Sequence, residues 1–141
     1  MGGNVYAYPA LAGMNLPPGQ ISVPVDFGYP YDVTLTALQS LNDEAVSIHT
    51  DSDFELRAIR LARATGAFRI RLNDSQGYYL SAAKLYSGNF LSGSVPFPFP
   101  LGVPFIFPAG SRIGIEIEDL SNAQNVIEIL FEGAKRYRLQ R

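Results

Sequence analysis

The sequence predicts an all-β protein, an antiparallel β-sandwich of the jelly-roll type with an extended amino-terminal arm. Several segments alternate apolar and polar residues with a period of two, which is typical of half-buried strands. Turn-forming residues separate these segments at intervals of roughly eight to twelve residues, the spacing of an all-β sandwich. A chain of 141 residues is also long enough to form one domain with its own core.

The clearest alternation is found in three segments: 67–72, 112–118 and 126–132. In each of them β-branched or aromatic residues occupy every other position, and such residues favour strands. Weaker candidates for strands are 21–25, 32–37, 45–49 and 78–81. Together with the segment considered next, they give about eight short strands, as a sandwich requires.

Segment 53–65 permits two interpretations. Its composition favours a helix, for which Asp53 would be the amino-terminal cap. It can also form a strand with a β-bulge, because the apolar alternation changes phase between Ala58 and Ile59. The strand is favoured, because the segments on both sides are themselves predicted to be strands.

All ten prolines fall in two clusters, one between positions 9 and 30 and the other between positions 96 and 108. Proline has no N–H group and interrupts the ladder of a central strand. We therefore expect an extended Pro/Gly/Tyr-rich arm at 1–31, a jelly-roll domain at 32–141 and a Pro/Phe-rich loop at 95–108. Regular strand pairing should be concentrated in 31–95 and 109–141.

The chain is poor in charge: 17% of its residues are charged, against about 25% in a typical soluble domain. The first 56 residues hold seven acids and no base, while the remainder holds eleven bases and six acids. A net charge of −2 does not favour nucleic-acid binding through a general basic field. No apolar run approaches the roughly 18 residues that span a membrane, and the amino end lacks the basic region of a signal peptide. We therefore expect no membrane partner and no specific nucleic-acid partner.

Few side chains are available for catalysis or metal binding. The chain has no cysteine and a single histidine, His49, and it lacks the Gly-x-Ser-x-Gly turn that presents a nucleophilic serine. Asp51, Asp53 and Glu55 alternate, so on a strand they would either bind Ca²⁺ or form a solvated edge that resists stray pairing. Their spacing lacks the glycine and the terminal glutamate of a calcium loop. We therefore expect no enzyme activity, no cofactor and no metal site.

The segment 95–108 contains five prolines and four phenylalanines without a charged residue. Burial of one Phe side chain is worth roughly 1.5–3 kcal/mol, so these rings should be covered, either by the sandwich itself or by another chain. The arm contains four tyrosines, which suit protein interfaces, and it is either a disordered tail or an arm that orders along a neighbouring subunit. The expected partner-binding residues are Tyr6, Tyr8, Tyr29, Tyr31, Phe97, Phe99, Phe105 and Phe107.

Five arginines form the densest basic run in the chain: Arg57, Arg60, Arg63, Arg69 and Arg71. On a pair of strands they would give a modest positive face, which could contact phosphate or an acidic partner through the guanidinium groups. The alternative interpretation is that they are exposed residues whose only contribution is to solubility. The sequence leaves both interpretations open.

Much of the chain resembles a known family. It is similar to small structural proteins encoded in head gene clusters of tailed bacteriophages, and most of all to the jelly-roll cement proteins of short-tailed phages such as those that infect Bordetella. The residues that carry the resemblance lie at 51–57, 104–111, 113–122, 125–128 and 131–137. They form a pattern of strands and turns and contain no active-site motif.

The resemblance implies a decoration or cement protein that stabilises the phage head. Such a protein lies on the capsid surface of the virion, after assembly in the host cytoplasm, and bridges neighbouring subunits. The implied partners are the major capsid protein and the protein itself, with a homodimer favoured and a trimer as the alternative. The physical argument agrees, because contacts to two neighbours reinforce each other through effective concentration.

Two other functions stay open at this point. The first is a jelly-roll module of a phage tail or fibre that binds carbohydrate or a receptor, which would need an open groove lined by tyrosines and carboxylates. The second is an enzyme that cleaves glycosidic bonds. It would need two carboxylates at a suitable separation, and a sequence alone does not give that separation.

Overall fold

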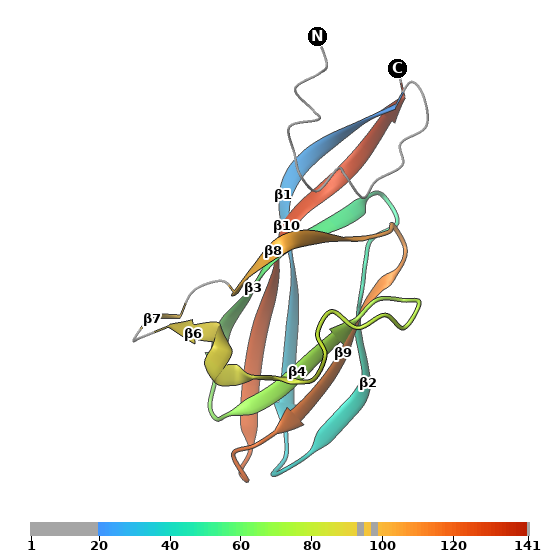
Figure 1. The fold of residues 1–141 in the computed structure, drawn as a ribbon. Coiled ribbons are helices and arrows are strands. Elements are labelled where there is room, and N and C mark those ends of the chain that lie inside the picture. The colour runs from blue at the N-terminus through green and yellow to red at the C-terminus, as the bar shows by residue number, and fades with distance from the viewer. Residues whose placement is uncertain (1–19, 93–94, 97–98, 141) are drawn as a thin grey trace.

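The computed structural model describes residues 20–92, 95–96 and 99–140, and it confirms the predicted all-β sandwich (Figure 1). Two four-stranded antiparallel sheets pack against each other around one core. The first sheet has the order β1 (Gln20–Leu35), β10 (Asn125–Gln140), β3 (Asp53–Ala64), β8 (Phe99–Phe107). The second has the order β2 (Ser40–Ser47), β9 (Arg112–Asp119), β4 (Phe68–Asn73), β5 (Leu85–Tyr86). Smaller elements are the 3-10 helix η3 (Ser87–Phe90) and the paired strands β6 (Leu91–Ser92) and β7 (Val95–Pro96).

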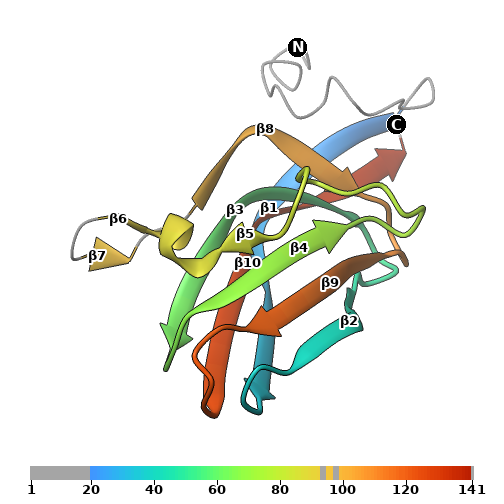
Figure 2. The ribbon, with the colours of Figure 1, turned by 60° about the horizontal axis from the view of Figure 1, so that its bottom comes forward.

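The strands of the two large sheets pair as a nested series. β1 pairs with β10, β2 with β9, β3 with β8, and β4 with β5, and every pair is antiparallel. The chain changes sheet at each connection from β1 to β4, so successive pairs alternate between the two sheets. Figure 2 shows β2, β9 and β4 lying across the strands of the other sheet. As a result, the first and last strands of the sandwich are direct neighbours.

The core lies between the sheets and is built by the alternation read from the sequence. The three clearest strand predictions are confirmed, in β4, β9 and β10. In β9, Ile113, Ile115 and Ile117 are at most 1% exposed. The core residues contributed by β4 and β10 are Phe68, Ile70, Leu72, Ile127, Ile129 and Phe131. Burial of each such side chain contributes roughly 1.5–3 kcal/mol, so this alternation supplies much of the stability.

β3 is a strand, as favoured over the helix, and it contains the expected bulge. Its register against β10 shifts at two places, the first of them at Arg57. There the buried positions change from Phe54 and Leu56 to Ile59 and Leu61. The described part of the chain contains no helix that is long and apolar enough to cross a membrane.

Gly133 of β10 lies beside this bulge, where the register between β10 and β3 shifts. A Cβ atom at this position would lie 1.8 Å from the carbonyl oxygen of Glu55 and 3.2 Å from Cα of Leu56. No side chain fits into that space. Glycine is therefore required for β3 and β10 to approach each other closely enough to pair.

The predicted boundary between positions 31 and 32 is wrong. β1 crosses it without interruption and pairs with β10 along its whole length. Pro24 and Pro30 fit into β1 because it is an edge strand, so nitrogen atoms on its outer side need no hydrogen-bond partner. The sandwich therefore includes the second part of the expected arm, whereas residues 1–19 lie outside the described residues.

The expectation of a loop at 95–108 is wrong for most of its length. β8 occupies the greater part of it and forms the other edge of the first sheet, while β7 accounts for two residues more. An edge position again explains how Pro100 and Pro104 are accommodated within a strand. In β1 and β8, a high proline content therefore indicates an edge strand, whereas the sequence alone predicts an unpaired segment.

The weaker strand predictions have mixed outcomes. Segment 21–25 lies within β1, 32–37 overlaps the end of β1 as far as Leu35, and 45–49 overlaps the second half of β2. Segment 78–81 is not a strand, because a single isolated bridge at Tyr79 is its only ladder contact among the described residues. That segment belongs to the long connection between β4 and β5.

Asp119, the last residue of β9, fixes one end of the sandwich and is 0% exposed. Its carboxylate accepts hydrogen bonds from Leu38 N at 2.8 Å, Ser121 N at 3.1 Å, Ser121 Oγ at 2.6 Å, Asn122 N at 3.0 Å and Asn125 Nδ2 at 3.0 Å. Burial opposes ionisation of this carboxyl, but the hydrogen bonds outweigh burial and hold its pKa well below the usual range. Asp119 thereby ties the turn between β1 and β2 to the loop between β9 and β10.

A buried ion pair holds the opposite end. Arg136 of β10 is 0% exposed and Glu55 of β3 is 2% exposed. The Arg136 Nε donates to Glu55 Oε1 at 2.9 Å, and Arg136 Nη2 lies 2.7 Å from the same oxygen. Arg57 Nη2 donates to this oxygen as well, at 2.8 Å. Close by, the Ala109 N–H donates to Asp53 Oδ1 at 2.9 Å, so polar contacts link β10, β3 and the turn before β9.

Candidate interaction surface

Three exposed tyrosines belong to β5 and to the connection between β4 and β5, at the margin of the second sheet. Tyr78, Tyr79 and Tyr86 are 68%, 46% and 52% exposed, and we call them the tyrosine surface. Among the described residues, Val25 and Leu38 are the remaining exposed large hydrophobic side chains, and neither belongs to this group. Exposed aromatic rings that carry a polar group are typical of protein interfaces. The tyrosine surface is therefore the first candidate for partner binding.

Tyr79 is held in place by two charged side chains on the outer face of this sheet. Its hydroxyl donates to Glu116 Oε2 at 2.7 Å, and this hydrogen bond raises the pKa of Tyr79 above its ordinary value. The guanidinium carbon of Arg71 lies 3.5 Å from the centre of the ring. Arg71 is itself fixed, because it donates to the carbonyl oxygens of Ser81 and Ala82, both at 3.2 Å. Tyr79 and Arg71 therefore lose little further side-chain conformational entropy when a partner binds.

A tight turn presents Tyr78. The Asp74 carboxylate accepts hydrogen bonds from the backbone N–H groups of Gln76 and Tyr78, each at 2.9 Å. Gly77 has a φ of 87°, a left-handed conformation that glycine adopts without strain. The Asp74 N–H also donates to the Tyr78 carbonyl oxygen at 2.9 Å, which closes the turn. The most exposed ring of the tyrosine surface thus rests on an ordered backbone.

Tyr86 lies in β5 opposite Arg69 of β4. Arg69 Nη2 donates to Glu118 Oε1 at 2.8 Å, and the Lys84 ammonium lies 3.5 Å from the same oxygen. The Tyr86 ring packs over Gly88, because a Cβ added there would lie only 2.5 Å from the ring. Two positive groups and one negative group therefore surround Tyr86, and with Arg71, Glu116 and Asp74 included the tyrosine surface carries no strong net charge.

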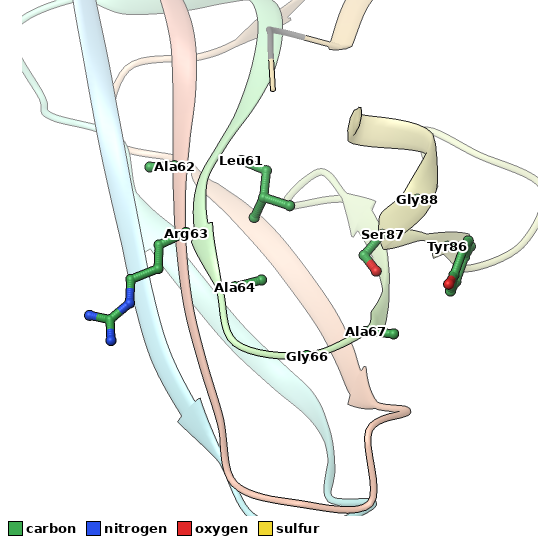
Figure 3. A pocket seen from close by; sticks show the side chains of 9 residues that line it. All are labelled: Leu61, Ala62, Arg63, Ala64, Gly66, Ala67, Tyr86, Ser87 and Gly88. Atoms are coloured by element: carbon green, nitrogen blue, oxygen red, sulfur yellow. The ribbon is translucent and has the colours of Figure 1, made fainter. Parts of the chain in front are cut away.

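A hollow of about 450 Å³ adjoins Tyr86, and we call it the Tyr86 hollow (Figure 3). Much of its lining is small, with Ala64, Ala67 and Gly88 among its residues. Figure 3 shows the Arg63 side chain pointing away from η3, so the charge of Arg63 is directed elsewhere. A hollow with such walls can accept an apolar side chain of a partner next to the exposed ring of Tyr86.

Three of the expected partner-binding residues are core residues of this chain. Tyr29, Tyr31 and Phe107 are 4%, 7% and 0% exposed, and Phe105 is partly buried against the same core. Their polar groups also have internal partners; the Tyr31 hydroxyl donates to Glu44 Oε1 at 3.2 Å, for example. The assignment of Tyr29, Tyr31 and Phe107 to an interface is therefore corrected, because the sandwich itself accounts for their burial, whereas that of Phe105 stays a prediction.

The other expected partner-binding residues are not placed by the structure. Tyr6, Tyr8 and Phe97 lie outside the described residues. The backbone of Phe99 pairs with Ile59 in β3, while the Phe99 side chain is outside the described part of the chain. Their role as interface residues stays a prediction.

The five arginines of the basic run do not form one positive face. They belong to different sheets, three to β3 and two to β4. Four of them pair with carboxylates: Arg57 with Glu55, Arg60 with Glu132, Arg63 with Glu128 and Arg69 with Glu118. Arg71 binds carbonyl oxygens and the Tyr79 ring, as described above. The expected positive face is therefore corrected to a set of locally balanced charges.

Two of the three alternating carboxylates are buried and do not belong to a solvated edge. Asp53 and Glu55 are 6% and 2% exposed and are held by the contacts given above, so the expectation of a solvated edge is wrong for both. Within the described residues, no group of three or more His, Cys, Asp or Glu side chains could hold a metal ion. Asp51 is bound to Lys135, whose Nζ lies 3.0 Å from Asp51 Oδ2.

Asp51 and Lys135 belong to one polar cluster at the same end of the sandwich. Tyr137 also donates to Asp51 Oδ2, at 3.1 Å, and Lys135 Nζ lies 3.1 Å from His49 Nδ1. The hydrogen bond from Lys135 holds the pKa of Asp51 below its ordinary value. Burial opposes the charge on Lys135, but Asp51 outweighs burial and raises the pKa of Lys135. His49 is thus part of a structural contact.

This cluster predicts a pH-dependent contribution to stability. The pKa of Asp51 is lower in the folded chain, so its contribution is present above the unfolded value of about 3.9 and is lost as the pH falls through the folded pKa. We expect Asp51→Asn to lower the melting temperature by a few degrees at pH 7, and this difference should shrink as the pH is lowered below about 4. Circular dichroism melts across this range measure it. Asp26→Asn is the control, because the Asp26 side chain is 99% exposed; a constant difference for Asp51→Asn would contradict the argument.

The sequence contained a signal for the tyrosine surface that the strand assignment concealed. Tyr78 and Tyr79 directly follow the turn sequence at 73–77, and assigning 78–81 to a strand implies that one of the two rings is buried. Because that segment is not a strand, both rings are exposed. Tyr86 could not be found from the sequence, since its exposure depends on the pairing of the short strand β5 with β4.

No protein-family model, no curated protein and no solved structure matches this chain.

Proposed function

We propose that the protein is a structural virion protein that binds and bridges neighbouring capsid subunits, and so stabilises a phage head as a cement or decoration protein. The resemblance in sequence supports this proposal. The fold supports it as well, since nested antiparallel pairs wrapped into two sheets are what a jelly roll requires. The partners in this proposal are the major capsid protein and a second copy of the chain, at the capsid surface.

The observation that carries the proposal is the tyrosine surface. Its three rings are exposed, and at least Tyr79 is fixed by Glu116 and Arg71 before any partner arrives. Preorganised aromatic groups lose little conformational entropy on binding, and tyrosine is enriched among the residues that dominate binding energies. The adjoining Tyr86 hollow offers a place for an apolar side chain of the partner.

Bridging imposes a further requirement on such a protein. Pressure from packaged DNA pulls neighbouring capsid subunits apart, so a clamp resists only if it holds at least two of them. Two moderate contacts joined in one particle reinforce each other through their effective concentration. The proposed function therefore needs stable surfaces and self-association, and it needs no catalytic step.

The proposal predicts that the double variant Tyr78→Ser/Tyr86→Ser loses capsid binding while it stays folded. Removal of two exposed rings from an interface should weaken binding at least about thirtyfold. Both rings are more than half exposed, so the melting temperature should change little. Co-sedimentation with shells of the major capsid protein from the same phage measures the binding.

Leu38→Ser is the matched control for this test. Leu38 is 59% exposed and lies in the turn between β1 and β2, away from the tyrosine surface. The control should bind shells as the unmodified chain does. If the double variant co-sediments normally, the tyrosine surface is not the capsid contact. If the unmodified chain does not co-sediment, the proposed function itself is wrong.

A carbohydrate-binding module is the second candidate, and one observation favours it. The Tyr79 ring lies next to the Glu116 carboxylate and the Arg71 guanidinium, a combination that can stack on a sugar ring and bind its hydroxyl groups. A panel of glycans added to the purified chain decides between the two candidates. A melting temperature that rises with one glycan, in a chain that ignores capsid shells, would favour the second.

A further inference from the structure

The ribbon formed by β1 and β10 is longer than the sheet that supports it. The two strands pair from Leu35↔Asn125 to Gln20↔Gln140 without a shift in register. β3 pairs with β10 only as far as Asp53↔Arg136. Beyond that point the strand segment from Tyr137 to Gln140 has β1 on one side and no third strand on the other among the described residues. Figure 1 shows the ribbon projecting past the other strands of its sheet.

The edge strands of the sandwich carry features that discourage pairing with other chains. β1 contains Pro24 and Pro30, and β8 contains Pro100 and Pro104. The register of β2 shifts between Leu41 and Glu44, and β5 has only two residues. Prolines, a bulge and a short length all blunt a sheet edge. The projecting part of β10 contains no proline and no register shift, and no described strand pairs with it on the side away from β1, so we call it the open edge.

The pairing pattern shows which backbone groups of β10 face this open edge. Pro24 lies opposite Arg136 and has no N–H to give, so at this position β1 and β10 exchange no hydrogen bonds, and the Arg136 backbone faces β3. Backbone direction repeats every second residue in a strand. The N–H and C=O groups of Arg138 and Gln140 therefore point the same way, into the space where β3 no longer runs.

The base of the ribbon is anchored to the sandwich. Lys135 and Tyr137 of β10 both bind the Asp51 carboxylate, at 3.0 Å and 3.1 Å. Lys135 also lies 4.3 Å from the centre of the Phe27 ring in β1. These contacts hold the two strands against the loop before β3, so the open edge is presented in a fixed direction. A two-stranded ribbon is marginal in water on its own, which makes an additional strand favourable.

We propose that the open edge of β10, residues 137–140, pairs with the same edge of a second copy of this chain. An antiparallel strand edge is complementary to itself under a two-fold rotation, so the contact is closed and stops at a dimer. The first sheets of the two copies then become one continuous sheet with both ribbons at its centre. The dimer carries two tyrosine surfaces, which provides the two attachment points that bridging needs. In this respect the inference deepens the proposed function and rests on it, although it is tested without a capsid.

Two proline substitutions on the same rung of the ribbon test the pairing. Ser22 lies opposite Arg138, and both residues share the orientation of the Pro24↔Arg136 rung, so neither N–H takes part in the ladder between β1 and β10. Arg138→Pro removes a donor from the proposed dimer contact, and Ser22→Pro removes one from the outer edge of β1. Sedimentation equilibrium of the purified chain should give a dimer for the unmodified protein and for Ser22→Pro. The dissociation constant of Arg138→Pro should be at least about thirtyfold higher, because two-fold symmetry removes the hydrogen bond twice.

A second measurement on the unmodified chain covers the case in which a proline variant does not fold. Amide hydrogen exchange at Arg138 and Gln140 should slow as the protein concentration rises, while exchange in β9 should not depend on concentration. A monomer at every concentration, a trimer, or a dimer that only Ser22→Pro disrupts would each overturn the proposed pairing. A dimer that fails to bind shells would leave the pairing intact and count against the proposed function alone.

Discussion

Replacement of Asp119 by alanine (Asp119→Ala) is expected to lower the free energy of unfolding by about 3–5 kcal/mol. The carboxylate is fully buried and accepts hydrogen bonds from the backbone of the turn before β2 and from the loop before β10. Without it, the N–H groups of Leu38 and Asn122 and the side-chain amide of Asn125 lose their acceptor. A buried donor left unsatisfied, here the Asn125 amide, costs about 1–3 kcal/mol, and the loss of the part-buried hydrogen bonds from Leu38 and Asn122 adds to it, so the total exceeds the effect of an ordinary substitution.

Urea unfolding followed by circular dichroism measures this loss, with Ser121→Ala as the matched control. Ser121 Oγ donates one of the hydrogen bonds to Asp119, at 2.6 Å. Its removal takes away a donor and leaves the carboxylate with its other partners, so the expected cost is about 1 kcal/mol. Equal effects of the two substitutions would show that Asp119 does not organise this end of the sandwich.

The second large effect is expected for Glu55→Gln, which should lower the free energy of unfolding by about 3 kcal/mol. Glutamine keeps the size of the side chain but removes the negative charge beside Arg136, which lies 2.7 Å away and is fully buried. Breaking a buried ion pair is costly because the remaining charge loses a negatively charged partner in a medium that solvates it poorly. Arg57, which binds the same oxygen, loses an acceptor of full charge as well.

Glu128→Gln is the control for this comparison, because it removes the same charge from an exposed pair. Glu128 and Arg63 are 42% and 56% exposed, and their charged atoms are 3.6 Å apart. Water screens such a pair, so the expected change is below about 1 kcal/mol. The two unfolding curves should therefore differ clearly in their midpoints. Similar midpoints would mean that burial of Arg136 and Glu55 does not strengthen their coupling.

Local patterns predicted the strands of this fold well where one face is buried. The isoleucines of β9 alternate in the sequence because every second side chain enters the core, and the phase change near Ala58 corresponds to a bulge in β3. These local patterns do not predict which strands pair with each other. Proline was read as a sign of unpaired chain, yet β1 and β8 tolerate it as edge strands. Whether a strand lies at an edge depends on all its neighbours, so no local pattern reveals it.

The same reason limits prediction of the interaction surface. Tyr31 and Phe107 looked like interface residues because they lie in segments poor in charge, but pairing with β10 and β3 turns them into the core. Tyr86 is exposed because it belongs to a two-residue strand at the margin of its sheet. Composition identified the residue types that bind partners, and only the three-dimensional pairing decides which of those residues are accessible.

The nested order of the strands has a consequence for folding during synthesis on the ribosome. The longest ladder joins β1 to β10, which is synthesised after all the other described strands. Contacts between such distant segments slow folding, because a large loop must close before they form. While β10 is still missing, the edges of β1 and β3 lack their shared hydrogen-bonded neighbour. Each nascent chain therefore passes through a period in which hydrophobic strands are uncovered and chaperones are its main protection from aggregation.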